Sequence, residues 1–227
     1  MKENKTKHAI VIFVKTPGFS PIKTRLAKSI GKIAAEEFYR LSIAAIQQVI
    51  STAVKSLDRN IVPFWAVAEN DLAVANSWTD FEIIFQRGDS LGERLYNIHN
   101  DLVQRFDSVA FIGGDAPQIN VDLIKSAFKF ETGVPQVNVG PACDGGFYLF
   151  SSNSPIDKSA WLTPIYSGAE TLSQLLNCLE GSHRINKLPM LTDVDAAEDL
   201  SALRFELESL ELLTLEQKEL LSWVRES

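Results

Sequence analysis

Hydrophobic residues along the chain fall into two kinds of segment that alternate. Short apolar runs, such as residues 9–14 (AIVIFV) and 109–112 (VAFI), are typical of buried strands. Between them lie longer stretches with apolar residues three or four positions apart, which predicts helices. Strands separated by helices of ten or more residues indicate βαβ units and a mostly parallel sheet.

The predicted elements follow one another along the chain without an internal repeat, a low-complexity stretch or a linker. Strands are expected at residues 9–14, 61–68, 81–85, 109–112, 136–140, 146–150 and 184–188. Helices are expected at residues 33–54, 71–77, 91–106, 121–130, 168–179, 196–207 and 215–224. The pattern predicts an α/β fold in one domain over residues 1–227.

Composition narrows the classes of function. The chain has 227 residues, of which 45% are hydrophobic, enough for a full core. A formal net charge of −7 argues against a nucleic-acid groove or an anionic membrane surface, since both need a broad basic face. No apolar run approaches the ~20 residues of a membrane span. Cys143 and Cys178 form no CxxC pair, which favours a reducing compartment, so we expect a cytoplasmic protein.

The loop after the first predicted strand carries unusual chemistry. Residues 15–25 (KTPGFSPIKTR) combine a Gly/Pro turn with two lysines and an arginine, and a helical stretch follows. Backbone N–H groups and fixed positive charge at such a position suit a polyphosphate. In an acidic chain a basic cluster in one loop is notable, although an ordinary strand–helix connection with solvated lysines is the alternative.

Polar motifs also follow other predicted strands. Residues 87–89 (RGD) come after the third strand and residues 113–115 (GGD) after the fourth. In parallel sheets, ligands bind beyond the carboxyl ends of the strands. We therefore expect these segments to meet the basic loop at one edge of the sheet.

Asp115 is a candidate metal ligand. It ends a buried strand after two glycines, which would let a nucleotide approach the backbone closely. A carboxylate there can hold a hard divalent cation that bridges phosphate oxygens. The alternative is a cap for the helix that starts near Asn120, which Pro117 makes awkward.

Asp193 and Asp195 lie in a late acidic segment, residues 191–200 (LTDVDAAEDL). Asp195 with Glu198 three residues later resembles a capping box for a helix starting at Ala196. Judged from this segment alone, the cap is the favoured interpretation of Asp195. A metal-ligand role is compatible with it, because a carboxylate has two oxygens.

Two glycine-containing segments each have two interpretations. Residues 144–146 (DGG) fit a hairpin turn, and equally a floor for an acceptor molecule. Residues 88–94 (GDSLGER) fit a helix start with Ser90 as cap and Glu93 completing the box. They could also place backbone groups and Arg94 near a base or phosphate.

The C-terminal part of the chain carries an apolar helical face. Such a face is usually core and less often a dimer surface, so a homodimer stays an alternative. Its residues are Leu207, Leu210, Leu213, Leu220, Leu221 and Val224.

Five motifs in a fixed order carry a resemblance to a known family. They are residues 23–26 (KTRL), 88–95 (GDSLGERL), 113–117 (GGDAP), 140–149 (GPACDGGFYL) and 193–200 (DVDAAEDL). Over residues 10–200 the chain resembles the DUF2064 family, glycosyltransferase-A-like proteins associated with radical-SAM or selenium-domain proteins and with arsenosugar biosynthesis. It is similar, more distantly, to nucleotidyltransferases such as the molybdenum-cofactor and phospholactate guanylyltransferases.

The resemblance implies a nucleotide-diphospho-sugar transferase fold, a Rossmann-like αβα sandwich. It also implies a transferase that uses Mg²⁺ or Mn²⁺, a nucleotide or nucleotide sugar and a small-molecule acceptor. The implied catalytic residues are Asp115, Lys23 and Asp144, and the implied metal ligands are Asp115 and Asp195. Nucleotide contacts are implied for Lys15, Pro17, Gly18, Lys23, Thr24, Arg25, Gly88, Asp89, Gly92, Arg94 and Gly114. Acceptor contacts are implied for Asp144, Gly145, Gly146 and Tyr148.

The chain departs from the family pattern in two places. Residues 18–23 form a longer stretch than the P-G-x-V-K-T-R-L form of the family. Residues 115–117 (DAP) lack the second carboxylate of the glycosyltransferase D-x-D signature. Sugar transfer, nucleotidyl transfer and a non-catalytic nucleotide-binding role therefore all stay open.

Overall fold

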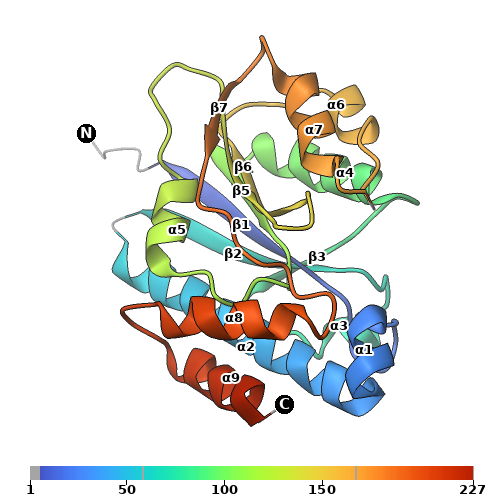
Figure 1. The fold of residues 1–227 in the computed structure, drawn as a ribbon. Coiled ribbons are helices and arrows are strands. Elements are labelled where there is room, and N and C mark those ends of the chain that lie inside the picture. Colours follow the sequence, from blue (N-terminus) through green and yellow to red (C-terminus); the bar gives the residue numbers. More distant parts are fainter. Residues whose placement is uncertain (1–5, 58, 167, 227) are drawn as a thin grey trace.

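The computed structural model describes residues 6–57, 59–166 and 168–226, and its centre is a twisted sheet (Figure 1). β1 (Lys7–Val14) lies inside this sheet, parallel to β2 (Asn60–Val67) on one side and to β4 (Ser108–Ile112) on the other. Residues of β1 are buried on both faces, as the continuous apolar run requires of a strand covered by two layers of helices.

Seven strands form the sheet in the order β3-β2-β1-β4-β6-β5-β7. The remaining strands are β3 (Glu82–Phe85), β5 (Gln136–Pro141), β6 (Phe147–Ser152) and β7 (Arg184–Lys187). β3 is parallel to β2, and β7 is parallel to β5. β6 runs antiparallel to both of its neighbours, β4 and β5. The sheet is therefore mostly parallel with one reversed strand.

Helices cover both faces of the sheet (Figure 1). One hydrophobic cluster joins α2 and α5 to one face, and a second joins α4, α6 and α7 to the other. A third cluster packs α1, α8 and α9 against the outer side of α2. The helices are α1 (Thr24–Ile30), α2 (Lys32–Ser56), α3 (Leu72–Ala75), α4 (Leu91–Val103), α5 (Val121–Ala127), α6 (Lys158–Leu162), α7 (Thr171–Leu179), α8 (Asp199–Glu208) and α9 (Leu215–Glu226). The arrangement is an αβα sandwich with an added helical layer.

The C-terminal apolar face belongs to this added layer. Leu207, Leu220 and Val224 are buried in the third cluster, while Leu210 and Leu213 are partly buried against it. The structure thus uses the face as core, in the way that such faces usually serve.

All seven predicted strands and seven predicted helices occur close to their expected positions. Two short helices, α1 and α6, were not predicted as separate elements, because seven and five residues are too few to show a helical period.

Among the described residues, no helix combines the length and the apolar character that a bilayer-spanning segment needs. Cys143 and Cys178 are both free and exposed.

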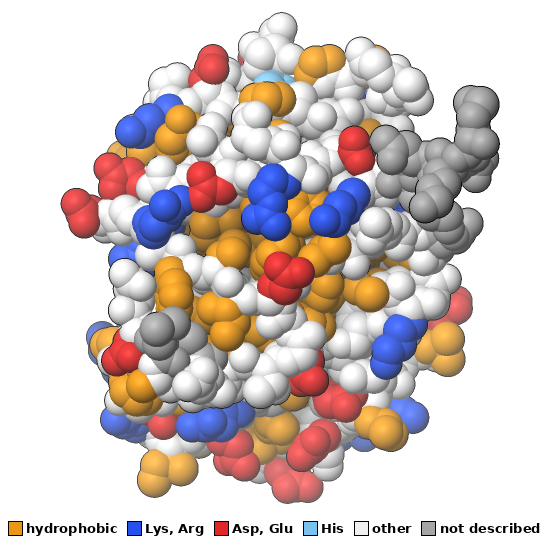
Figure 2. All heavy atoms as spheres, turned by 180° about the vertical axis from the view of Figure 1, so that it is seen from behind, with side chains coloured by type: hydrophobic (Ala, Val, Ile, Leu, Met, Phe, Trp, Pro, Cys, Tyr) orange, Lys and Arg blue, Asp and Glu red, His pale blue; other side chains and the backbone are white. Residues whose placement is uncertain are grey.

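The surface opposite the view of Figure 1 carries charges of both signs. Figure 2 shows hydrophobic side chains exposed in the middle of this face, with Lys and Arg side chains along their upper border. Asp and Glu side chains are interspersed with basic ones over the rest of the face.

Candidate functional site

A cleft of about 770 Å³ opens at the edge of the sheet where the parallel strands end. The loop after β1, the start of α4, the end of β4 and the β5–β6 turn all contribute to its wall. Of the residues implied by the sequence, the cleft is lined by Lys15, Lys23, Thr24, Arg25, Asp89, Arg94, Gly114, Asp115, Asp144, Gly146, Tyr148 and Asp195. The expected convergence of distant motifs at one sheet edge is confirmed.

The late acidic segment reaches this edge because of the strand that precedes it. β7 runs parallel to β5, so the chain leaves β7 at the same edge. The Leu191 N–H then donates to the Pro141 carbonyl at 3.1 Å, and the Val194 N–H donates to the Asp115 carbonyl at 3.0 Å. These backbone hydrogen bonds fix the late segment beside the end of β4.

Three carboxylates meet at this point. One oxygen from each of Asp115, Asp193 and Asp195 lies within 4.8 Å of the others, and all three residues are partly buried. Burial, with the nearby charge of Asp115, raises the pKa of Asp193 to about 8, although Lys23 acts in the opposite direction. The surroundings of Asp193 therefore favour the protonated form of its carboxyl group.

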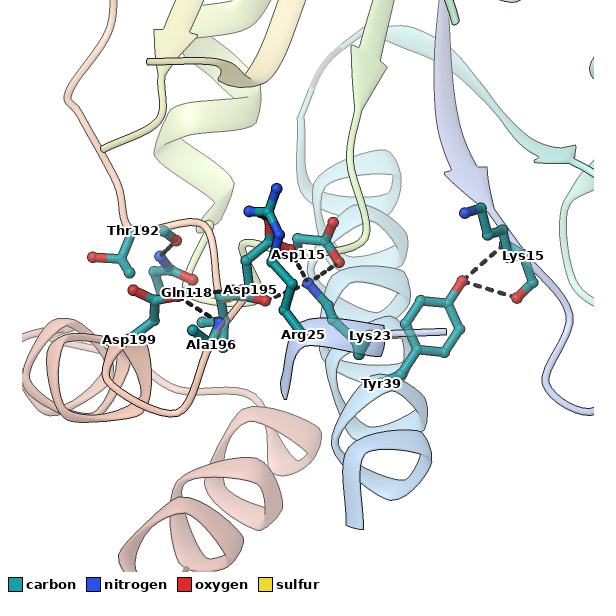
Figure 3. Close-up of polar contacts among 11 residues, drawn as sticks. Lys15, Lys23, Arg25, Tyr39, Asp115, Gln118, Thr192, Asp195, Ala196 and Asp199 are labelled. Atoms are coloured by element: carbon teal, nitrogen blue, oxygen red, sulfur yellow. Dashed lines mark hydrogen bonds and ion pairs between the residues drawn. The ribbon is translucent and has the colours of Figure 1, made fainter. Parts of the chain in front are cut away.

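Lys23 supplies the main positive charge to this cluster (Figure 3). Its Nζ lies 2.6 Å from Asp115 Oδ1 and 3.4 Å from Asp195 Oδ1, and it also donates to the Val194 carbonyl. Only 4% of the Lys23 side chain is exposed. Its backbone is left-handed, with φ of 45°, just before α1 begins. Arg25 lies on the outer side, 67% exposed, with Nη1 3.3 Å from Asp195 Oδ2.

The donor set fits a divalent cation. Carboxylate oxygens are the ligands that Mg²⁺ and Mn²⁺ prefer, and these cations commonly bind through one or two protein carboxylates plus phosphate oxygens. A nearby cation favours the charged form of a carboxylate whose pKa is raised by burial and by like charge, as it is in Asp193. Asp115, Asp193 and Asp195 could therefore hold such an ion next to the basic loop.

The loop after β1 is anchored by side chains from two other segments. The Tyr39 hydroxyl of α2 accepts from the Lys15 N–H at 2.9 Å and donates to the Lys15 carbonyl at 3.0 Å. Glu69, after β2, accepts from the N–H and the hydroxyl of Thr16, and the Trp78 indole N–H donates to the same hydroxyl. Burial would raise the pKa of Glu69, but hydrogen bonds from Ser20 and Thr16 outweigh it and lower that pKa. The first part of the loop is thus held in place.

The end of the cleft near α4 is built from one continuous segment. The Ser90 hydroxyl caps α4 by accepting from the Glu93 N–H at 3.2 Å, which confirms the predicted helix start. Arg94 Nε donates to the Gly88 carbonyl at 3.0 Å, and its Nη1 lies 3.3 Å from Gln86 Oε1. The guanidinium is therefore positioned at the cleft wall by its own neighbours in the chain.

The end near the β5–β6 turn also matches its predicted hairpin. Asp144 Oδ1 accepts from the Gly146 N–H at 2.9 Å, which is the side-chain turn expected of an Asp-Gly-Gly sequence. The Tyr148 hydroxyl donates to the Pro189 carbonyl at 2.9 Å, and the ring is buried. Asp144 and Tyr148 both line the cleft, and of the two only Asp144 is exposed.

Several implied nucleotide or acceptor residues lie outside the cleft lining. Pro17 and Gly18 belong to a turn that is closed by hydrogen bonds to the Thr16 carbonyl, and Gly18 lines a separate surface pocket. A Cβ at Gly92 would lie 2.3 Å from the Trp161 carbonyl oxygen, so this glycine allows α4 to approach α6. A Cβ on Gly145 would lie 1.9 Å from the Ala169 carbonyl oxygen. Gly88 has a left-handed φ of 128°, and a Cβ there would meet Glu93.

The favoured local interpretation of Asp195 is wrong. α8 begins at Asp199, and Glu198 at its N-cap makes no side-chain capping bond. Asp199 accepts instead from the N–H groups of Asp195 and Ala196, at 2.9 and 2.8 Å. The Asp195 carboxylate is thereby free to face Lys23 and Arg25, which local capping rules could not anticipate.

Asp193 belongs to the carboxylate cluster but was not among the predicted site residues. In residues 193–195 (DVD) two aspartates flank Val194, which is fully buried. That alternation was the available signal. Tyr39, Gln86 and Tyr166 also line the cleft without having been predicted, because nothing in their local sequence distinguishes them from core or surface residues.

Comparison with protein-family models now adds an independent finding. Residues 50–165, about half of the chain, match the model "Uncharacterized protein conserved in bacteria (DUF2064)". The chain belongs to the DUF2064 family. The resemblance drawn from the five ordered motifs is therefore confirmed. No curated protein matches this DUF2064 chain.

Solved structures confirm the fold of this DUF2064 protein. A Desulfovibrio desulfuricans G20 protein, provisionally assigned as a nucleotide-diphospho-sugar transferase, superimposes with a TM-score of 0.80. The two share 22% identity over 97% of this chain and 98% of that one. A CMP:2-keto-3-deoxy-manno-octonic acid synthetase complexed with CTP gives a TM-score of 0.52 at 14% identity, covering 90% of this chain and 100% of that one. A cytidylyltransferase from Leptospira borgpetersenii also gives 0.52 at 14% identity, covering 97% and 94%. The shared architecture is the nucleotide-diphospho-sugar transferase fold.

Proposed function

We propose that this protein is a metal-dependent transferase that uses a nucleotide-activated sugar donor. The observation that carries the proposal is the meeting of Lys23, Arg25 and three carboxylates in one cleft at the sheet edge. A diphosphate needs positive charge, and a divalent cation needs carboxylates, so the two groups together fit a metal-bound diphosphate. The first structural neighbour named above is assigned to the same class.

Each region of the cleft has a role in this proposal. Asp115, Asp193 and Asp195 would hold Mg²⁺ or Mn²⁺, which would neutralise charge on the departing diphosphate. Arg25 and Lys15 offer further positive charge from the loop after β1. The start of α4, with Asp89 and Arg94, would face the base.

The acceptor would enter beside the β5–β6 turn. Its hydroxyl attacks the anomeric carbon as the bond between that carbon and the β-phosphate oxygen breaks. Asp144 lines the cleft on this side. We assign it the role of general base, which takes the proton from the acceptor hydroxyl. The nucleoside diphosphate leaves with the bonding electron pair.

A thermal-shift panel of nucleotide sugars, nucleoside diphosphates and nucleoside triphosphates, each with and without Mn²⁺, tests this function. A ligand at about 100 times its Kd stabilises the folded state by about 2.7 kcal/mol, which is a readily measured rise in Tm. We expect at least one nucleotide sugar to stabilise the protein in a Mn²⁺-dependent manner. A panel in which no nucleotide sugar raises the Tm would overturn the proposal.

Nucleotidyl transfer is a second candidate, favoured by two neighbours of the same fold. The synthetase bound to CTP and the Leptospira cytidylyltransferase both act on nucleotides, by their names. In that reaction an acceptor phosphate attacks the α-phosphorus of a nucleoside triphosphate, and pyrophosphate leaves. Preferential stabilisation by a triphosphate, with pyrophosphate release on turnover, would select it over sugar transfer.

A further inference from the structure

The position of Lys23 is unusual for a phosphate-binding side chain. Its side chain is almost fully buried, and its ammonium group points to Asp115 and Asp195 in the carboxylate cluster (Figure 3). Its partners are Asp115, Asp195 and the Val194 carbonyl, all of them oxygen donors. An ammonium ion surrounded by oxygens in this way is in an environment typical of a bound cation.

Lys23 and a divalent cation cannot share this place. The ammonium lies 2.6 Å from Asp115 Oδ1, whereas Mg²⁺ binds carboxylate oxygens at about 2.0–2.1 Å. An ion bound by the same two oxygens, Asp115 Oδ1 and Asp195 Oδ1, would therefore lie in the space that holds Nζ. The positive charges of the two would also repel strongly at such a separation.

We propose that Lys23 is an exchangeable internal cation, which fills the divalent site of the metal-free protein and moves toward the donor phosphates when the metal enters. The inference rests on the proposed function, since it assigns Lys23 a second position beside the diphosphate. The four-carbon lysine stem can make this movement, because its ammonium is a point charge on a flexible chain. Lys15, Thr24 and Arg25 line the cleft where the group would arrive.

The exchange would stabilise the metal-free cluster. Negative charges placed this close together repel one another, and the ammonium of Lys23 offsets that repulsion. The exchange also couples two ligands. Once released, the ammonium of Lys23 lacks an anionic partner until a donor phosphate binds. Metal and donor therefore each favour the binding of the other.

The first experiment measures Mn²⁺ binding alone, by the EPR signal of the free ion, in the wild-type protein and in Lys23→Met. Without a competing ammonium, the variant should bind Mn²⁺ about tenfold or more tightly. Arg25→Met is the matched control, since it removes the same charge two residues further on, at an exposed position in the first turn of α1. It should change Mn²⁺ affinity by about threefold or less, because solvent screens its charge. Equal effects of the two variants, or weaker binding by Lys23→Met, would overturn the exchange.

The second experiment needs no variant and therefore stands even if Lys23→Met does not fold. Wild-type protein is labelled with an amine-specific reagent, and the modification of each lysine is followed by mass spectrometry with and without Mn²⁺. Lys23 should label slowly without metal and about fivefold or more faster at saturating Mn²⁺, because its ammonium leaves the buried cluster. Lys32, whose side chain is 82% exposed, serves as the internal reference and should not change. An unchanged Lys23 rate at saturating Mn²⁺ contradicts the proposal, as does a failure of Mn²⁺ to bind.

Both measurements use the metal alone. The exchange can therefore fail while nucleotide sugars still bind and turn over, which would leave the proposed function intact. Conversely, Mn²⁺ can release Lys23 in a protein that no nucleotide sugar stabilises.

Discussion

The two ends of the cleft are assembled in opposite ways. At the α4 end, contacts join residues close in sequence, such as Arg94 with Gly88 and Ser90 with Glu93. At the carboxylate end, Lys23 contacts Asp115 and Asp195. Lys23 and Asp195 are 172 positions apart in the chain. One end is thus determined by a local segment and the other by the topology of the whole sheet.

Because of this difference, the two ends depend to different degrees on the rest of the fold for their stability. Local contacts at the α4 end form whenever that helix forms, so they need little support from the rest of the molecule. The carboxylate end requires three segments to be held together against charge repulsion. The electrostatic energy of this cluster therefore changes when ions bind. We therefore expect chemistry and metal response at the carboxylate end, and mainly structural sensitivity at the α4 end.

The largest expected effect tests the carboxylate end directly. Asp115→Asn should lower turnover about 100-fold or more, because it removes one metal ligand and the partner of Lys23 in a single change. Asp89→Asn is the matched control, since Asp89 lines the same cleft at the α4 end. Asp89→Asn should lower turnover by about tenfold or less. Steady-state kinetics on both variants measure the contrast, and similar losses would contradict the division of roles.

An intermediate effect is expected at the α4 end, on stability. In Gly92→Ala the new Cβ would lie 2.3 Å from the Trp161 carbonyl oxygen, so α4 and α6 must separate. We expect a loss of about 1–2 kcal/mol in the free energy of unfolding, since overpacking outweighs the helix propensity of alanine. Urea unfolding gives the value. Gly113→Ala, where a Cβ meets no atom within 4 Å, is the control and should stay close to wild type.

The last expected effect is a pH dependence at the carboxylate end. The pKa of Asp193 is about 8 in the folded protein and near 4 in the unfolded chain, so folding retains a proton between these values. The stability of the metal-free protein should therefore fall as pH rises from about 5 to 8, relative to Asp193→Asn, which cannot ionise. Urea unfolding of both proteins across this range measures the difference. Saturating Mn²⁺ should abolish the fall, because a cation favours the charged carboxylate, and a parallel pH profile of the two proteins would refute the assignment.

The sequence predicted the framework of the fold because the dominant signals are local. Apolar runs such as 9–14 and 109–112 became buried strands, and their order with the helices predicted the parallel sheet. The reversed direction of β6 followed from the Asp144-Gly145-Gly146 turn, which is a short-range signal. The short helices α1 and α6 were not predicted, because they are too short to show a helical repeat of hydrophobic residues.

The candidate site was predicted less completely, for a physical reason. Asp115 was found because two glycines mark its strand end. Asp195 was first interpreted as a cap, since its real partners, Lys23 and Arg25, are about 170 positions away. Asp193 was passed over, as its pKa depends on burial that only the folded chain produces. Glycines 92 and 145 lie outside the cleft lining and pack closely against the backbone of other segments. A glycine needed for close packing and one needed for ligand approach are alike in sequence.

The reversed strand offers a route to redesign. Because β6 alone of the seven described strands runs against its neighbours, the turn before it projects from the same edge as the strand ends that carry the charged groups. The pairing of Ala142 with Leu191 fastens the base of that turn, leaving residues 144–146 at its tip. Lengthening or exchanging this tip would reshape the proposed acceptor entrance while the proposed donor side kept its architecture, so one scaffold could be adapted to many acceptors by loop grafting.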